Sequence, residues 1–359
     1  MPSFLIVKSS AIGDVIQTFP VLEYLRKKFP DAKIDWLVEK SCRDLLLAHP
    51  LLNKVHTIDT KLWRNTLHKV ETWQQIIAMK RGLASQHYDA LFDVQGNSKS
   101  GLFTLLAKAK DKVGFGFHTV HERPNYFVTN IHFEVPREQC VRARYVKLVQ
   151  NYFEDKEPFV YSPVALRITK EEESRLGMIL EDTRLGRPKI MVAFGSKWRN
   201  KQLPIPTLKA FLSHIAQEIK ASFVFIYGSE EERKSAEELQ EAFAKTSVTV
   251  GKLSLPLWQA LMSKMDAVIA MDSAALHLCA TTATPSFSVF GPSLGSIFCP
   301  KGSHHFHQGS CPYKKEFLKQ CPILRTCETG SCIRDLAHEE LMITFKKFWQ
   351  KEGLLAARN

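Results

Sequence analysis

The sequence predicts an α/β fold with two domains, each built on a parallel sheet, and a central cleft that both sheets face. The chain has 359 residues, of which 45% are hydrophobic, and this is more apolar material than one core usually holds. Short apolar runs alternate with helical patterns in both halves, as in sheets covered by helices on both faces. The alternation stops at an acidic, proline-containing stretch, 154–158. These observations together favour two α/β domains.

In the first half, runs rich in β-branched and aromatic residues predict strands, and amphipathic stretches between them predict helices. The predicted strands are residues 4–8, 34–38, 54–58 and 90–94, and the clearest helices are 15–29 and 72–85. Pro20 should kink the first helix or mark its beginning, because proline cannot continue a helical hydrogen-bond ladder.

The second half repeats the alternation after a linker at 152–167. Its predicted strands are 190–194, 223–227, 248–250, 267–271 and 286–290, with a helix at 230–243. We therefore expect a first domain at 1–160 and a second at 161–335. We expect the last segment, 336–359, to form a helix that packs back across both domains, with Leu341, Phe345 and Phe348 at helical spacing.

The net charge of +12 is concentrated in one part of the chain. Residues 61–147 hold fourteen Lys or Arg against seven Asp or Glu, whereas residues 1–60 hold eight against seven. Such a field suits nucleic acid, an anionic membrane surface or an acidic substrate, and an ordinary solvated surface explains it equally well. No run approaches the eighteen apolar residues of a membrane-spanning helix. We expect a cytosolic protein that is not cleaved.

Eight cysteines without a secretory signal indicate reduced thiols. Five of them lie between Cys299 and Cys332. A zinc site is a weaker hypothesis, because no two cysteines are spaced as Cys-x-x-Cys; its ligands would come from Cys311, Cys321, Cys327 and Cys332, with His304, His305 and His307 nearby. We assign no metal site from the sequence.

Four predicted strands end in polar or glycine-containing turns, at 8–14, 194–197, 227–230 and 271–274. Ligands of parallel sheets bind beyond the carboxyl ends of the strands, so these turns are candidate binding sites. In the first turn, Gly13 can adopt a conformation closed to other residues, and Asp14 then opens a helix. Asp14 could simply cap that helix, which is the commoner role, or it could act as a general base.

Two later segments suit a phosphate. The loop 196–201 places three cations and the Ser196 hydroxyl just after a strand, and Lys201 could neutralise a phosphate there. An ordinary basic loop is the alternative. In 271–277 a buried strand leads into a helix, whose first N–H groups attract anions. His277, five residues after Asp272, could reach the same ligand, although a lone helical histidine is more often a core residue.

Several familiar motifs are absent from the sequence. It contains no Asp-x-Asp pair of the kind that holds a metal on a sugar nucleotide, so cations and backbone dipoles would have to stabilise a leaving diphosphate. Neither G-x-G-x-x-G nor G-x-x-x-x-G-K-[ST] occurs. A dinucleotide oxidoreductase and a P-loop NTPase therefore lose support.

Four segments resemble glycosyltransferase family 9, the lipopolysaccharide heptosyltransferases. Residues 6–20 resemble the opening of these proteins, 271–278 resemble their nucleotide-binding motif, and 61–64 and 88–100 are similar to the first heptosyltransferase of the inner core. The resemblance implies a GT-B fold with two Rossmann-like domains. It also implies metal-independent, inverting transfer of heptose from an ADP-heptose donor to the Kdo sugar of lipid A, without a cofactor.

The resemblance also implies roles for individual residues. Asp14 would be the general base, beside Ser10 and Gly13 at the acceptor, and Lys61 and Arg64 would meet the anionic Kdo. Lys201 would act on the diphosphate. The other implied donor contacts are Ser196 at the diphosphate, Glu230 at the ribose, Leu253 near the adenine, and Asp272, Ser273, Ala274 and His277 at the phosphates and sugar. Because the acceptor is a lipid, we expect peripheral contact with the anionic cytoplasmic face of the inner membrane.

Three alternatives remain open from the sequence. The first is a relative of the second heptosyltransferase, or another family 9 enzyme with a different donor or acceptor. The second is a polyanion-binding protein that uses 61–147, although we expect no nucleic acid partner. The third is a sugar-nucleotide epimerase, which would turn over the donor without an acceptor.

Overall fold

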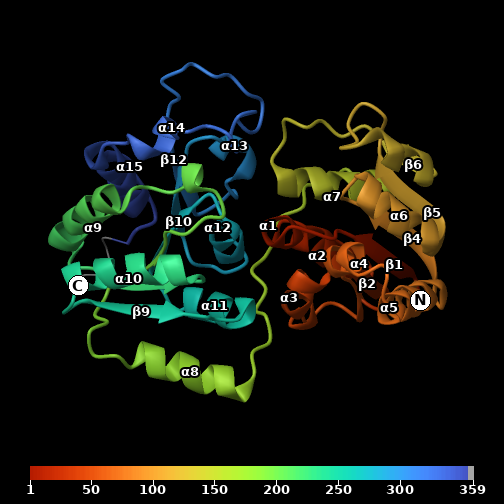
Figure 1. Cartoon of the computed structure of the whole chain (residues 1–359), viewed down its shortest axis with the longest axis horizontal. Coiled ribbons are helices and arrows are strands. Elements are labelled where there is room, and N and C mark those ends of the chain that lie inside the picture. The colour runs from red at the N-terminus through yellow and green to blue at the C-terminus, as the bar shows by residue number, and fades with distance from the viewer. Residues whose placement is uncertain (355–359) are drawn as a thin grey trace. The chain divides into compact units, whose positions relative to one another are not determined.

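The computed structural model describes residues 1–354 and divides into two compact units, Met1–Ser162 and Pro163–Asn359. Each unit holds one six-stranded sheet in which every neighbouring pair of strands is parallel (Figure 1). Within the described part of the chain, no helix is both long and apolar enough to cross a bilayer.

The sheet of the first unit has the order β3-β2-β1-β4-β5-β6. Its strands are β1 (Ser3–Val7), β2 (Lys33–Glu39), β3 (Lys54–Ile58), β4 (His87–Asp93), β5 (Lys108–Phe115) and β6 (Ile131–Phe133). Its helices are α1 (Ile12–Ile16), α2 (Phe19–Lys28), α3 (Arg43–Leu47), α4 (Thr60–Asn65), α5 (Val70–Ala84), α6 (Ser98–Leu106) and α7 (Val141–Tyr152), with short 3-10 turns η1 (Lys40–Cys42) and η2 (Arg123–Val128). The strands β1, β2 and β4 are almost fully buried, because helices cover both faces.

The sheet of the second unit has the order β12-β11-β10-β7-β8-β9. Its strands are β7 (Lys189–Ala193), β8 (Ser222–Tyr227), β9 (Ser247–Gly251), β10 (Ala267–Met271), β11 (Ser286–Phe290) and β12 (His304–Gln308). Its helices are α8 (Lys170–Leu180), α9 (Ile205–Ile219), α10 (Glu230–Ala242), α11 (Leu255–Met262), α12 (Ala274–Cys279), α13 (Gly295–Phe298), α14 (Ser331–Arg334) and α15 (His338–Lys351), with the 3-10 turn η3 (Arg199–Lys201).

Both sheets have the same topology. Counted in chain order within each unit, the strands lie in the order 3-2-1-4-5-6, which is that of the Rossmann fold. In this order the chain reverses direction between the first and fourth strands, so their loops part on opposite sides and leave room for a ligand. The expected sites therefore lie between β1 and β4 and between β7 and β10. The α/β prediction with two Rossmann-like domains is confirmed.

All nine predicted strands are present, but three more were not predicted. β5 carries charged residues at alternate positions, β6 has only three residues, and β12 reads His-His-Phe-His-Gln. The single helix expected at 15–29 is two helices, because α1 ends at Ile16 and α2 begins at Phe19 with Pro20 in its first turn. Proline is tolerated there, since the first N–H groups of a helix have no intrahelical partner.

The C-terminal helix α15 packs on α9 and β12 of its own unit. Leu341, Phe345 and Phe348 are buried in the same core cluster as Phe211 and Phe287, and the Phe211 and Phe345 rings meet edge to face. This face is the one predicted from helical spacing. The expected packing across both domains stays a prediction, and residues 355–359 of the predicted segment 336–359 lie outside the described residues.

Candidate active site

The switch point of the first sheet brings together the loops that follow β1 and β4. The Gln95 side-chain oxygen, just after β4, accepts hydrogen bonds from the Ser9 backbone N–H at 2.7 Å and from the Ser9 hydroxyl at 3.1 Å. The two loops are therefore joined by direct hydrogen bonds, and α1 starts from this anchored position with Asp14 in its first turn.

Asp14 lies where both of its predicted roles remain possible. One carboxylate oxygen accepts a hydrogen bond from the Ala11 backbone N–H at 3.2 Å, as a helix-capping residue does. The side chain is only half-buried. Gly13 lies inside α1 with an ordinary helical conformation, so the expectation of a conformation that only glycine can adopt was wrong.

A buried cation lies close to Asp14. Lys8 is 5% exposed, and its ammonium group donates a hydrogen bond to the Tyr145 hydroxyl at 2.8 Å. Burial alone lowers the pKa of Lys8, but Tyr145, Asp14 and Asp93 raise it, and the net change is upward. Lys8 therefore stays charged and supplies a fixed positive charge beside the Asp14 carboxylate.

A polar network extends this site across the sheet edge. The Lys99 ammonium group donates to the Ser10 hydroxyl at 3.2 Å and to a carboxylate oxygen of Glu39 at 3.1 Å. Glu39, the last residue of β2, also accepts from the Thr60 backbone N–H at 3.2 Å and from the Thr60 hydroxyl. Because Thr60 begins α4, Glu39 ties the start of that helix to Ser10.

The predicted acceptor residues Lys61 and Arg64 follow Thr60 on α4, and both are exposed. Sequence reasoning did not assign a role to Glu39, Gln95 or Lys99, which the structure places in the same network as Ser10. Gln95 and Lys99 fall within the segment 88–100 that carries the family resemblance. The turn after the predicted strand 90–94 was the signal that could have identified them.

The predicted donor residues follow consecutive strands of the second sheet. Because all strands are parallel, their carboxyl ends lie along one edge. In spatial order along this edge, the residues after the strands are Ser293 after β11, Asp272 after β10, Ser196 after β7, Glu230 after β8 and Leu253 after β9. The structure thus brings together four residues that were predicted from separate segments, and it adds Ser293, which was not predicted.

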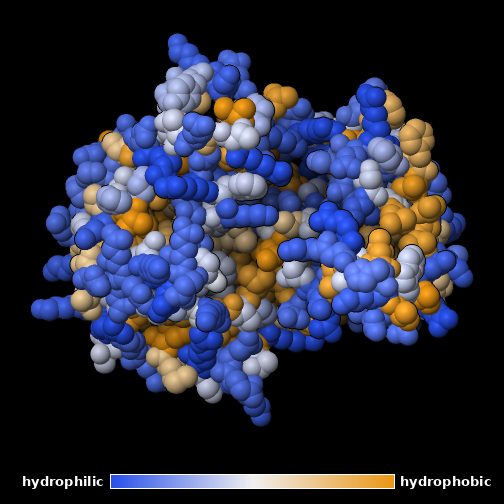
Figure 2. All heavy atoms as spheres, in the orientation of Figure 1, coloured by the Kyte–Doolittle hydropathy of each residue, from blue (hydrophilic) through white to orange (hydrophobic). Residues whose placement is uncertain are grey.

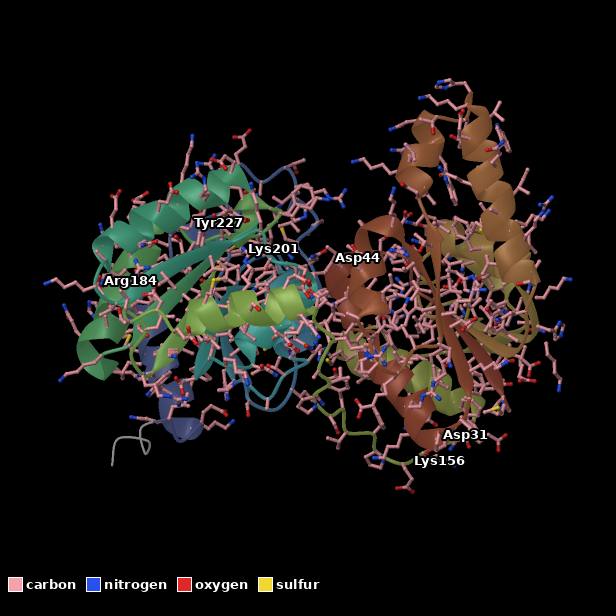
Figure 3. The ribbon with its side chains drawn as sticks, turned by 90° about the horizontal axis from the view of Figure 1, so that it is seen from below. Asp31, Asp44, Lys156, Arg184, Lys201 and Tyr227 are labelled. Carbon is pink, nitrogen blue, oxygen red and sulfur yellow. The ribbon has the colours of Figure 1, made fainter. Side chains whose placement is uncertain are left out.

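A buried ion pair lies at the switch point of this sheet. The Lys201 ammonium nitrogen is 2.6 Å from a carboxylate oxygen of Asp272, and each residue is 7% exposed. The Ser293 hydroxyl donates to the same oxygen. Figure 3 labels Lys201 together with Tyr227, the last residue of β8, in the second unit. The pairing was not predicted, since the sequence analysis treated Lys201 and Asp272 as separate ligand contacts.

The remaining donor candidates differ in exposure. Glu230 begins α10 and is exposed, and its carboxylate accepts a hydrogen bond from Arg233 at 2.8 Å, which lowers the pKa of Glu230. Leu253 is half-buried after β9. His277 is buried in α12, the short helix that begins at Ala274 after its N-cap residue Ser273. The edge therefore offers a buried cation at one end and exposed or apolar contacts at the other.

This arrangement suits a nucleoside diphosphate sugar. An ammonium group has three N–H donors, so Lys201 can hold Asp272 with one and a phosphate oxygen with another. A carboxylate such as Glu230 can accept hydrogen bonds from ribose hydroxyls, and an aliphatic side chain such as Leu253 can pack on a base. In the first unit, Asp14 offers a proton acceptor beside hydroxyl and ammonium groups.

Comparisons with known proteins agree with this geometry. The model of glycosyltransferase family 9 (heptosyltransferase) matches residues 76–325. Lipopolysaccharide heptosyltransferase 1 of Pseudomonas aeruginosa is 25% identical over 346 residues, covering 94% of this chain and 92% of that protein. The same enzyme of Campylobacter coli is 25% identical over 303 residues, covering 82% and 85%. The solved structure of Escherichia coli heptosyltransferase WaaC with ADP has a TM-score of 0.77 at 20% identity, covering 96% of this chain and 99% of that chain.

Proposed function

The chain belongs to glycosyltransferase family 9 and is therefore a glycosyltransferase, and from this premise we propose that it transfers heptose from ADP-L-glycero-D-manno-heptose to the Kdo of lipid A. The transfer inverts the anomeric configuration and needs no catalytic metal. Lipopolysaccharide heptosyltransferase 1 proteins that align with most of the chain support this donor and acceptor. The donor class is also supported by the solved WaaC structures, whose titles name ADP and ADP-2-deoxy-2-fluoro heptose.

In the proposed mechanism, Asp14 accepts the proton of the acceptor hydroxyl as that oxygen attacks the anomeric carbon from the face opposite ADP. Lys201 and the first N–H groups of α12, at Ser273 and Ala274, stabilise the negative charge that develops on the leaving diphosphate. Ser196 contributes a hydroxyl to the same phosphates.

Other side chains position the two substrates. Glu230 binds the ribose hydroxyls and Leu253 lies against the adenine, while His277 contributes to the donor sugar site. Lys61 and Arg64 bind the Kdo carboxylate, with Ser10 and Gly13 nearby. Charge-assisted hydrogen bonds from arginine and lysine to a carboxylate suit this anionic sugar.

The observation that carries the proposal is the order of the donor residues. Ser196, Glu230, Leu253 and Asp272 come from four separate segments of the sequence, yet they follow four adjacent strands on one edge of a Rossmann sheet. The buried Lys201–Asp272 pair lies at the switch point of that sheet, which is where α/β proteins bind nucleotides. Residues that share one ligand are expected to gather in this way.

The proposal is tested by measuring ADP release from ADP-heptose in EDTA, with and without deacylated Kdo-lipid A. We expect release that depends on the acceptor and survives the chelator. Release without any acceptor would indicate hydrolysis or an epimerase-like reaction. If no heptose donor releases ADP, the donor is a different sugar nucleotide.

The choice of acceptor has one specific alternative. An enzyme like the second heptosyltransferase would add to heptose rather than to Kdo, so a heptosylated core is assayed beside deacylated Kdo-lipid A. A polyanion-binding protein would instead show steeply salt-dependent binding to unrelated polyanions and no ADP release.

We further propose that the first unit contacts the anionic cytoplasmic face of the inner membrane, because its acceptor is a lipid. Figure 2 shows apolar side chains gathered on the face that carries α5 and α6. This outer apolar face consists of Val70, Trp73, Ile77, Leu102, Leu105 and Phe127, all of them exposed. Lys112 donates to the Leu105 carbonyl at 3.2 Å, and Lys80, Arg81 and Lys108 on the same elements are also exposed. Apolar side chains beside cations are typical of interfacial helices.

Replacing Trp73 and Phe127 together by serine is expected to weaken binding to vesicles that contain phosphatidylglycerol by about tenfold or more, since each large side chain contributes on the order of 1.5–3 kcal/mol when fully buried. The side chains are 52% and 76% exposed. The matched control is Met178→Ser in the second unit, which removes a side chain that is 67% exposed. Vesicle flotation measures binding. Equal flotation of the double variant and the wild type would refute this surface, whereas ADP release with the deacylated acceptor should not change.

A further inference from the structure

Four cysteines that are separate in the sequence meet at one pocket of the second unit. Cys311, Cys321, Cys327 and Cys332 lie between β12 and the end of α14, and all four line the same pocket. Apolar side chains such as Phe317 and Leu324 line it as well, as do Tyr313, Pro292 and Pro312. All four thiols are free and half-buried. We call this site the cysteine pocket.

The thiols of the cysteine pocket influence one another. The pKa of Cys332 is raised to about 11, first by burial and then by the charges that Cys311, Cys327 and Cys321 would carry. Four thiolates in one pocket repel each other unless a cation is bound between them, because like charges disfavour ionisation of their neighbours. The pocket therefore favours protonated thiols when empty and thiolates only around a positive ion.

The turn that follows Cys327 already provides a hydrogen bond that stabilises a thiolate. The Gly330 backbone N–H donates to the Cys327 sulfur at 3.4 Å, and this bond is the largest cause of the lowered pKa of that thiol. Gly330 has a φ of 60°, and a Cβ atom there would lie 2.7 Å from the side-chain oxygen of Asn200. The turn thus requires glycine and aims a donor at the sulfur, as hydrogen bonds around metal-bound ligands commonly do.

We propose that the cysteine pocket binds one thiophilic divalent cation, zinc or iron, through all four thiolates. Tetrahedral sites with four sulfur ligands are typical of these two metals, and a site without an open position is structural rather than catalytic. Binding releases the thiol protons to solvent and changes no oxidation state. As the side chains lie now, no three His, Cys, Asp or Glu groups of the described residues form a ready ligand set. The thiols must therefore turn toward the pocket centre by rotation about their Cα–Cβ bonds.

The segment that holds the cysteine pocket also supports the donor site on the β11 side. The Cys321 backbone N–H donates to the Pro292 carbonyl at 2.7 Å, and the Leu294 N–H donates to the Lys319 carbonyl at 2.9 Å. Between Pro292 and Leu294 lies Ser293, whose hydroxyl donates to Asp272. A metal that fixes Cys321 therefore fixes one partner of Asp272.

The same segment supports the donor site on the β7 side. The Asn200 amide donates to the Leu324 carbonyl at 3.0 Å and to the Cys327 carbonyl at 2.6 Å, and Asn200 directly precedes Lys201. The Arg325 guanidinium lies 5.1 Å from the centre of the Trp198 ring, in the loop after β7. The metal would hold both partners of the Lys201–Asp272 pair in place through the backbone, without touching the substrate.

Metal content of the purified full-length protein tests the proposal. We expect about one zinc or iron per chain by elemental analysis of the wild type and of Cys140→Ser, a control thiol in the first unit, and no bound metal in Cys327→Ser. Cobalt(II) added to the metal-free protein should give the charge-transfer and d–d absorption of a tetrahedral thiolate complex. A wild-type protein that holds no metal and takes up no cobalt, or a disulfide among the four cysteines, would overturn the proposal.

A second measurement covers the case in which Cys327→Ser does not fold. In the folded wild type, iodoacetamide should modify these four cysteines slowly, and removal of the metal should speed their modification, as counted by mass spectrometry. Equal rates before and after removal contradict the site. Neither readout depends on transferase activity, so this proposal and the proposed function can fail independently. Metal content measured before and after the EDTA treatment shows whether a structural metal is lost during the ADP-release assay.

Discussion

Replacing Asp14 by asparagine is expected to lower kcat for heptose transfer by about a hundredfold to ten-thousandfold, the usual contribution of a general base. Asparagine keeps an oxygen that can accept the Ala11 N–H bond, so the start of α1 should persist. It cannot accept the proton of the acceptor hydroxyl. The measurement is kcat for acceptor-dependent ADP release, together with the melting temperature of each variant.

The matched control is Asp44→Asn, because Asp44 lies in the first turn of α3, another five-residue helix of the same unit, and is exposed. This control should leave kcat unchanged. Asp14→Ala removes the capping oxygen as well as the base, and we expect the activity loss of the asparagine variant with an added loss of stability of about 0.5–2 kcal/mol. If Asp14→Asn loses less than tenfold in kcat and only Asp14→Ala lowers the melting temperature, Asp14 is a cap and not a base.

Much of the fold could be predicted because local patterns coincide with tertiary burial. The strands β3, β10 and β11 have the predicted bounds, since their apolar runs are bounded by residues that favour turns. Strand β5 was missed because its outer residues alternate lysine with alanine or aspartate. Such a strand is recognisable only by its pairing with β4, which brings in residues more than fifteen positions away. Propensity carries no information about that pairing.

The donor site was predicted in its residues but not in its contacts. Each strand-end turn is visible in the sequence, whereas the strand order decides that β10 lies beside β7 and that Asp272 meets Lys201. Ser293 was missed for the same reason, since only β11 places it beside Asp272. The cysteine spacing could not be interpreted either, because irregular chain between Cys311 and Cys332 closes the pocket. Long-range geometry of this kind has no local signature.

Replacing Lys201 by methionine is expected to reduce kcat/KM for ADP-heptose by about tenfold to more than a hundredfold, because a charge-assisted hydrogen bond to phosphate contributes about 1.5–3 kcal/mol. It should also destabilise the second unit by roughly 3–5 kcal/mol, since the Asp272 carboxylate would stay buried without its cation. Asp272→Asn removes the other partner of the pair. It should cause a comparable loss of stability but a smaller loss of ADP binding, because the Lys201 charge remains.

The double variant Lys201→Met with Asp272→Asn separates structure from catalysis. With both charges removed, no uncompensated ion remains in the interior, so the melting temperature should recover much of the loss seen in either single variant. The activity should not recover, because the cation that faces the diphosphate is still absent. Calorimetry of ADP binding and denaturant unfolding of the four proteins complete the cycle. A double variant that regains both stability and kcat/KM would show that the pair only holds β7 and β10 together, and that the charge on the leaving diphosphate is stabilised by other groups.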